Sequence, residues 1–176
     1  MKRLTTRVLA GLTLAALALP GPASAQEDEL AQIRQATSRF QTVEAAEAAG
    51  YELGYVNGSG VRIVDGCVAH PDEGAMGYHY INQVLMDDLV TDPLQPEALV
   101  YAPMADGSTR LVAVEYIVRG EGSDPPGVST PPEILGHPMH IIVPAVGWYT
   151  QHAWVWDHNP AGVLADWNPW VSCPTA

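Results

Sequence analysis

Two apolar runs on either side of an Asp-Gly pair constrain the fold of this chain more than any other feature. PEALVYAPMA precedes Asp106-Gly107, and STRLVAVEYIV follows it. An Asp-Gly pair between strands favours a two-residue hairpin turn, and such a turn pairs Ala98 with Glu115. The second run is apolar on both faces, which is typical of a central strand. The sequence therefore predicts a hairpin at the centre of a sheet.

The rest of the chain adds one long helix and further strands. Residues 28–49 place apolar side chains at spacings of three and four, which predicts an amphipathic helix. Asn57-Gly58 predicts another hairpin, and PMHIIVP and WYTQHAWVWDH are predicted as two later strands. We therefore expect an α+β fold, in which an N-terminal helix is followed by a mainly antiparallel sheet that could curl into a barrel-like form.

Residues 1–25 have the layout of a secretory signal peptide. They contain a basic start, an apolar run and an Ala-Ser-Ala cleavage site that ends at Ala25. Cleavage there leaves residues 26–176 as a single secreted α+β domain, which is long enough for one core. The apolar run is too short to span a bilayer, and no later segment approaches that length. We expect a secreted or periplasmic protein without a membrane partner.

The charge of the mature chain excludes several kinds of partner. Without the leader, five arginines and no lysine remain beside 20 acidic residues, a formal charge of −15. Nucleic acids and anionic lipids are bound through Lys and Arg, so neither is an expected partner, whereas a small molecule is. The absence of lysine also excludes Schiff-base chemistry. The sequence contains no signal for an oligomeric state.

Cys67 and Cys173 are the only two cysteines in the chain. In an exported protein, two cysteines most simply form one disulfide, which here would tie the C-terminus to a segment far earlier in the sequence. Two free, buried thiols are the alternative.

Glu115 is the most informative single residue. On a regular strand it shares a face with Leu111, Ala113 and Ile117. A carboxylate among small apolar side chains is costly unless it is paired, hydrogen-bonded, neutralised or bound to a cation. The alternatives to a functional role are a position near the sheet edge, where the carboxylate reaches water, and a bond to a buried arginine.

Two histidines occupy comparable positions on other predicted strands. His79 lies in GAMGYHYIN and His152 in QHAWVWDH. Two imidazoles and the carboxylate of Glu115 would form a plausible set of ligands for a divalent ion such as Zn, Mn, Fe or Cu. His140 or His158 could supply a fourth ligand. Each histidine taken alone is more simply a core or surface side chain, and no residue is assigned a catalytic role.

An aromatic-lined pocket is the alternative site. Its expected lining residues are Tyr78, Tyr80, Tyr116 and Trp154. Aromatic side chains bind sugars and apolar molecules well, although a tryptophan-rich core would produce the same pattern.

Several stretches resemble an uncharacterised family of secreted bacterial proteins. They are GAMGYHYIN, VAVEYIV and HAWVWDHNPAGVLADWNPWVSC, together with the helix ending AAEAAGY. Family members carry similar G-M-G-Y-H-Y, V-E-Y and H-x-W-x-W-x-x-N-P-x-G-x-x-x-x-W-N-P motifs. The resemblance covers most of the mature chain, with residues 52–65 departing from it as an extra hairpin, and it implies no particular activity.

The sequence thus predicts an exported metal-binding protein, which could be a metalloenzyme of unassigned reaction. One alternative is a non-enzymatic module that binds a small ligand or a peptide in the aromatic-lined pocket. Another is a structural protein in which the His–Glu contacts only satisfy the core.

Overall fold

The computed structural model describes residues 22–174. Residues 1–21, which contain most of the predicted signal peptide, lie outside the described residues. The helices are α1 (Pro22–Thr37), a 3-10 turn η1 (Ser38–Phe40), α2 (Val43–Glu47) and α3 (Gln83–Asp88). The strands are β1 (Tyr51–Leu53), β2 (Tyr55–Val56), β3 (Arg62–Ile63), β4 (Cys67–His70), β5 (Gly74–Asn82), β6 (Ala98–Pro103), β7 (Thr109–Arg119), β8 (Glu133–Ile134), β9 (His137–Pro138) and β10 (Trp148–Ala153).

The predicted helix over residues 28–49 is interrupted. α1 ends at Thr37, and α2 begins after Thr42, whose side-chain oxygen accepts a hydrogen bond from the backbone N–H of Ala45 at 3.3 Å. Threonine is a favoured residue at this capping position because it satisfies a backbone donor that the helix itself leaves free. Phe40 and Ala46 are nevertheless both buried, so the chain keeps its apolar side on the sheet through the break.

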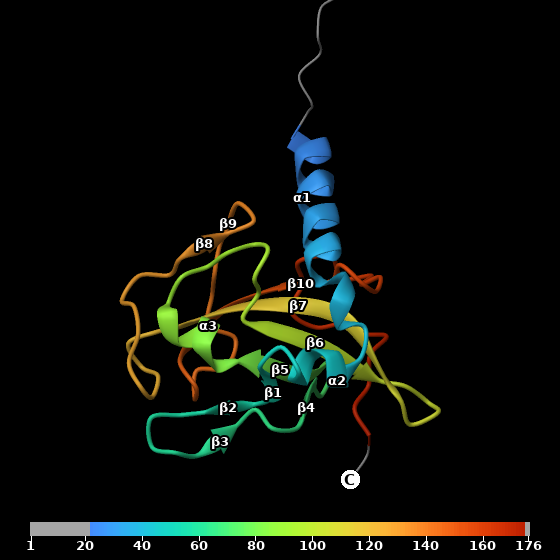
Figure 1. Ribbon diagram of the computed structural model, residues 1–176. Helices are drawn as coiled ribbons and strands as arrows, with labels where there is room; N and C mark the ends of the chain where they lie inside the picture. The colour runs from blue at the N-terminus through green and yellow to red at the C-terminus, as the bar shows by residue number, and fades with distance from the viewer. Residues whose placement is uncertain (1–21, 175–176) are drawn as a thin grey trace, which may run out of the picture.

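The main sheet has six antiparallel strands and confirms the α+β class (Figure 1). Its order is β1-β5-β6-β7-β10, and β4 also pairs with β5. β6 and β7 form the predicted central hairpin, in which Ala98 faces Glu115. Among the described strands, β1 and β10 lie at opposite ends of this order and do not pair. The sheet is therefore open, and the barrel-like closure is not found.

A β-bulge changes the register near the turn of this hairpin. Beyond Val100 the pairing shifts by one residue, so that Tyr101 faces Leu111. A bulge inserts one unpaired residue and therefore reverses which side chains share a face. The expectation that Leu111 lies beside Glu115 was wrong for this reason: Leu111 packs in the core cluster on the opposite face.

Two other local predictions were wrong in detail. β2 and β3 form a hairpin at the Asn57-Gly58 position, but the loop is longer than two residues, because the N–H of Asn57 donates to the carbonyl of Val61 at 2.9 Å. The segment PMHIIVP contributes only its first residue to β9 and is otherwise irregular. It contacts the sheet through one bridge, between His140 and Thr150.

The two faces of the sheet are packed differently. One face lies against α1, η1 and α2 and forms the largest core cluster, which includes Phe40, Tyr101, Tyr116 and Met139. The other face is covered by two smaller clusters, one of which includes Ala98, Ile117 and Trp148. Small residues near the centre of this second face leave room beside Glu115.

Cys67 and Cys173 form the predicted disulfide, with a sequence separation of 106 residues. It ties the end of the chain to β4, at the side of the main sheet. Disulfides persist mainly in oxidising compartments, so this bond is consistent with an extracellular setting. In the described part of the chain, no helix combines the length and the apolar character that crossing a membrane requires.

Glu97, immediately before β6, is an acidic group inside the core. It is 1% exposed, and its Oε2 accepts the backbone N–H of Ile117 at 2.9 Å. Burial raises the pKa of Glu97 to about 8. Its backbone hydrogen bonds oppose this rise, and the nearby carboxylates of Asp88 and Asp92 add to it. The folded protein therefore keeps a proton on Glu97 at pH values at which the unfolded chain has lost it.

This difference predicts a pH-dependent stability. Between pH 4.5 and about 8 the unfolded chain binds fewer protons at Glu97 than the folded protein, so the free energy of unfolding falls as the pH rises. The full contribution is present below pH 4.5 and is lost by about pH 8. Glu97→Gln keeps an acceptor for Ile117 but cannot ionise. Relative to this variant, the wild type should lose on the order of 4 kcal/mol across the window, measured by urea denaturation at a series of pH values. Parallel pH profiles for the two proteins would contradict the prediction.

Candidate metal centre

Three strands of the sheet place two histidines and a glutamate on its second face. His79 lies in the middle of β5, Glu115 in β7 and His152 in β10. His152 is the direct cross-strand neighbour of Glu115, and Ala98 of β6 faces Glu115 from the other side. β5 lies two strand spacings from β7, roughly 10 Å. His79 faces Val100 of β6, so it approaches Glu115 diagonally across β6, beside the small methyl side chain of Ala98.

The three side chains converge. His79 Nε2 lies 3.2 Å from Glu115 Oε2, and His152 Nδ1 lies 3.5 Å from Glu115 Oε1. The two imidazole rings meet edge to face, with their centroids 5.7 Å apart. One ligand atom from each residue lies within 4.8 Å of the other two. Ligands of a tetrahedral ion with bonds near 2.1 Å are roughly 3.4 Å apart, so the widest ligand separation needs to contract by up to about 1.4 Å around an ion.

All three residues are buried, at 2% exposed for His79, 4% for Glu115 and 0% for His152. Burial raises the pKa of Glu115 well above its usual value, and the charges of Asp166 and Glu97 add to this. Burial lowers the pKa of His79 to about 4, against a smaller opposing effect of the nearby backbone of Gly77. The pKa of His152 lies well below its usual value, mainly through burial. Without a bound cation, the environment therefore favours the neutral form of each group.

The polar atoms of the cluster have few partners besides one another. His79 Nδ1, His152 Nδ1 and His152 Nε2 are buried and form no hydrogen bond of good geometry in the described structure. No arginine in residues 22–174 forms an ion pair with Glu115, and the only lysine of the chain is Lys2. A buried carboxyl between two imidazoles, with no arginine paired to it, is the arrangement expected of a cation site whose ligands are present.

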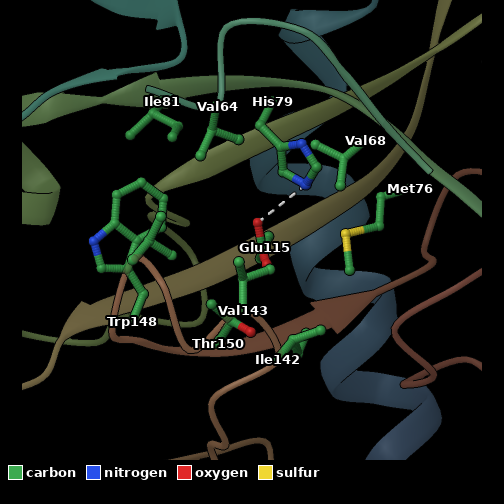
Figure 2. A pocket seen from close by; sticks show the side chains of 11 residues that line it. Val64, Val68, Met76, His79, Ile81, Glu115, Ile142, Val143, Trp148 and Thr150 are labelled. Carbon is green, nitrogen blue, oxygen red and sulfur yellow. Dashed lines mark ion pairs between the residues drawn. The ribbon is translucent and has the colours of Figure 1, made fainter. Parts of the chain in front are cut away.

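A cavity of about 190 Å³ lies against the cluster on the same face of the sheet (Figure 2). Figure 2 shows the contact between His79 and Glu115 as a dashed line, with mostly apolar side chains around it. The lining consists of His79, Glu115 and Thr150 together with Val64, Val68, Met76, Ile81, Ile142, Val143, Val146 and Trp148. His152 is not part of the lining. The cluster therefore meets this cavity at His79 and Glu115, while the ring of His152 lies beside that of Trp154.

The two additional histidine ligands considered from the sequence lie elsewhere. His140 Nε2 pairs with Asp166 Oδ2 at 3.0 Å in an exposed position, and neither residue belongs to the three-residue cluster. His158 is exposed and lies beside Trp170. It was expected to continue the face of His152, but β10 ends at Ala153, so strand alternation no longer applies five residues later.

None of the four aromatic residues expected to line a pocket lines the cavity. Tyr80 and Tyr116 pack with the core cluster on the face covered by α1, and Tyr78 shares the side of Tyr80 by strand alternation. Trp154 does lie on the side of His152, and its ring is stacked at 6.2 Å from that imidazole. Its indole N–H donates to the carbonyl of Ala165 at 2.6 Å, which holds it in the core. The correction follows from alternation: side chains next to His79 and Glu115 in sequence point away from the cavity.

Asp166 and Thr150 are residues near the cluster that the sequence did not reveal. Asp166 Oδ1 is buried without a hydrogen-bond partner, and the carboxylate raises the pKa of Glu115. Thr150 lines the cavity, and its hydroxyl is also buried without a partner. Asp166 lies in an irregular segment, where no periodic pattern indicates where a side chain points. Thr150 is two residues before His152, and side chains two residues apart on a strand point to the same face, so strand alternation could have identified it.

Comparison with protein-family models, with curated proteins and with solved structures finds no match for this chain. The resemblance to a family of secreted bacterial proteins therefore stays a prediction, and the case for a function depends on the geometry of the cluster.

Gly77 controls how closely β5 approaches β6 beside the cluster. Its φ is +119°, and a Cβ added there would lie 2.5 Å from the backbone carbonyl oxygen of Tyr101. An alanine would both disfavour this backbone conformation and force β5 away from β6. Because His79 is two residues further along β5, such a displacement would also move one proposed ligand.

Gly77→Ala should therefore be more destabilising than a glycine substitution that has the backbone cost alone. Gly107 has φ +84° and open space where a Cβ would be, so Gly107→Ala is the matched control. We expect Gly107→Ala to lower the free energy of unfolding by about 1–2 kcal/mol and Gly77→Ala by about 3 kcal/mol or more, measured by urea denaturation. Equal losses for the two variants would show that the strands tolerate a Cβ at Gly77.

Proposed function

We propose that this chain is an exported metal-binding protein whose centre is formed by His79, Glu115 and His152. The observation that carries the proposal is the convergence of the buried side chains of His79, Glu115 and His152 around one point. A divalent ion bound there would compensate the buried carboxylate of Glu115. It would also use His152 Nδ1, which otherwise has no hydrogen-bond partner.

The donor set favours a borderline transition-metal ion. Two imidazoles and one carboxylate suit Zn, Mn, Fe or Cu, whereas Ca and Mg prefer sites made entirely of oxygen atoms. Both cysteines are in the disulfide, so no thiolate competes for the ion. Three protein ligands leave at least one coordination position open. An ion with an open position can polarise a bound oxygen atom as a Lewis acid, which is the chemistry that an enzymatic role would use.

Export is the second part of the proposal. The signal-peptide pattern of residues 1–25 and the disulfide between Cys67 and Cys173 support it independently. A metal site formed after export loads from the ions available outside the cytoplasm.

A structural role for the three residues is the competing explanation. In that case Glu115 stays protonated and shares hydrogen bonds with His79 and His152, and no ion is needed. The two explanations differ in metal content and in the effect of an isosteric substitution of Glu115.

Metal content tests the proposal directly. Protein exported to the periplasm of an expression host and purified without a histidine tag should contain about one transition-metal ion per chain, measured by plasma mass spectrometry. Glu115→Gln preserves size but removes the anionic ligand, and His79→Ala removes an imidazole. Both variants should lose stoichiometric metal.

His70→Ala is the matched control. His70 is only half-buried and is not part of the cluster, and its Nε2 lies 3.8 Å from Glu73 Oε1. This variant should therefore keep the ion. Metal-free wild-type protein that takes up none of the four candidate ions on reconstitution would refute the proposed centre. Equal metal content in Glu115→Gln and wild type would place the ion elsewhere.

A further inference from the structure

We infer that the cavity beside the cluster binds a small, mainly apolar molecule through one anionic oxygen donor, which coordinates the metal ion. This inference rests on the proposed metal centre and adds the chemical class of its ligand. Two of the proposed metal ligands, His79 and Glu115, line the cavity, whereas His152 does not. An ion held by the three therefore has its open side toward the cavity.

The walls of the cavity set the body of the ligand. The lining is made mostly of aliphatic side chains and Trp148, including Val68 of β4 and Val146 of the irregular segment before β10. Such a surface offers no hydrogen bonds to water, so it binds apolar groups in preference to water. An engineered apolar cavity of about 150 Å³ admits benzene, so a cavity of about 190 Å³ accommodates one substituted ring or a branched chain of similar size. A sugar or a peptide side chain with several polar groups would leave those groups unpartnered.

The polar groups of the cavity lie near the proposed ion. Besides His79 and Glu115, the one hydroxyl in the lining is that of Thr150, which is buried and has no hydrogen-bond partner. Thr150 lies two residues before His152 on β10, on the same face of the sheet. The Thr150 hydroxyl could then donate a hydrogen bond to a ligand oxygen bound at the ion. The cavity thus has one polar end and an apolar remainder.

Charge balance favours an anionic donor. A divalent ion bound to one carboxylate and two neutral imidazoles has a net charge of +1, and its three protein ligands are at most 4% exposed. Uncompensated charge is costly in such surroundings, and a ligand with one negative oxygen neutralises it. We therefore expect a carboxylate or phenolate attached to a compact apolar group.

Two probes separate the cavity from the metal. Toluene has the apolar body without a donor, and it should bind metal-free protein, measured by isothermal titration calorimetry. Benzoate has the same ring with an anionic donor, and it should bind cobalt-loaded protein roughly tenfold or more tighter than metal-free protein. It should also shift the visible d–d absorption bands of the cobalt ion, which reports direct coordination.

Variants that fill the cavity should weaken both probes without removing the ion. Val68→Phe and Val146→Phe each place a larger side chain in the cavity, from different walls. A folding defect in one variant therefore leaves the other informative. We expect a loss of affinity of roughly tenfold or more for toluene and for benzoate, with cobalt stoichiometry unchanged. Val84→Phe is the control, because Val84 is 79% exposed and does not line the cavity.

The possible failures are distinguishable. Stoichiometric cobalt without binding of either probe would leave the metal centre intact and overturn the ligand inference. Toluene binding by a protein that takes up neither cobalt nor any of the four candidate ions would overturn the metal centre and, with it, the coordinated donor. Benzoate binding that is the same in Val68→Phe, Val146→Phe and wild type would place benzoate outside the cavity and overturn the inference.

Discussion

The carboxyl group of Glu115 lies in the middle of a sheet, with no arginine of residues 22–174 paired to it and almost no contact with water. Such a group is tolerated only if its neighbours satisfy it. The sheet order provides those neighbours, because β10 places His152 directly opposite, while His79 of β5 faces Val100 and reaches Glu115 diagonally across β6, beside the small side chain of Ala98. The need to accommodate this one carboxyl therefore explains the histidines on both sides of it and the small residue beside them.

The separation of the two sheet faces follows from the same strands. The tyrosines that alternate with His79 and Glu115 point to the face covered by α1 and α2, where Tyr101 and Tyr116 donate hydrogen bonds to backbone carbonyl oxygens. That face is a packed core in which these tyrosine hydroxyls have hydrogen-bond partners. The other face has a cavity, unpartnered polar atoms and the buried cluster. A period of two thus assigns packing to one side of the sheet and the candidate site to the other.

The sequence predicted the central hairpin, the disulfide and the three converging residues, because each depends on strong local chemistry. Asp106-Gly107 correctly indicated the hairpin, but the two-residue turn was wrong, because Met104 rather than Ala105 bonds to Ser108. The bulge between Val100 and Tyr101 shifts the register back to the predicted pairing of Ala98 with Glu115. An unpaired carboxylate in an apolar strand indicated that partners must exist. The bulge that moved Leu111 to the other face could not be predicted, because it arises from packing across strands rather than from the run of residues itself. Asp166 was missed for a related reason: irregular segments are placed by tertiary contacts and have no period to interpret.

Crystals grown with the ion that metal analysis identifies allow the central claim to be tested by anomalous diffraction at the absorption edge of that ion. We expect one anomalous peak about 2.0–2.2 Å from an imidazole nitrogen of His79, an imidazole nitrogen of His152 and a carboxylate oxygen of Glu115. A further coordination position should face the cavity that His79 and Glu115 line. A peak at the exposed His140–Asp166 pair instead, or no peak between the three buried residues in metal-saturated crystals, would contradict it.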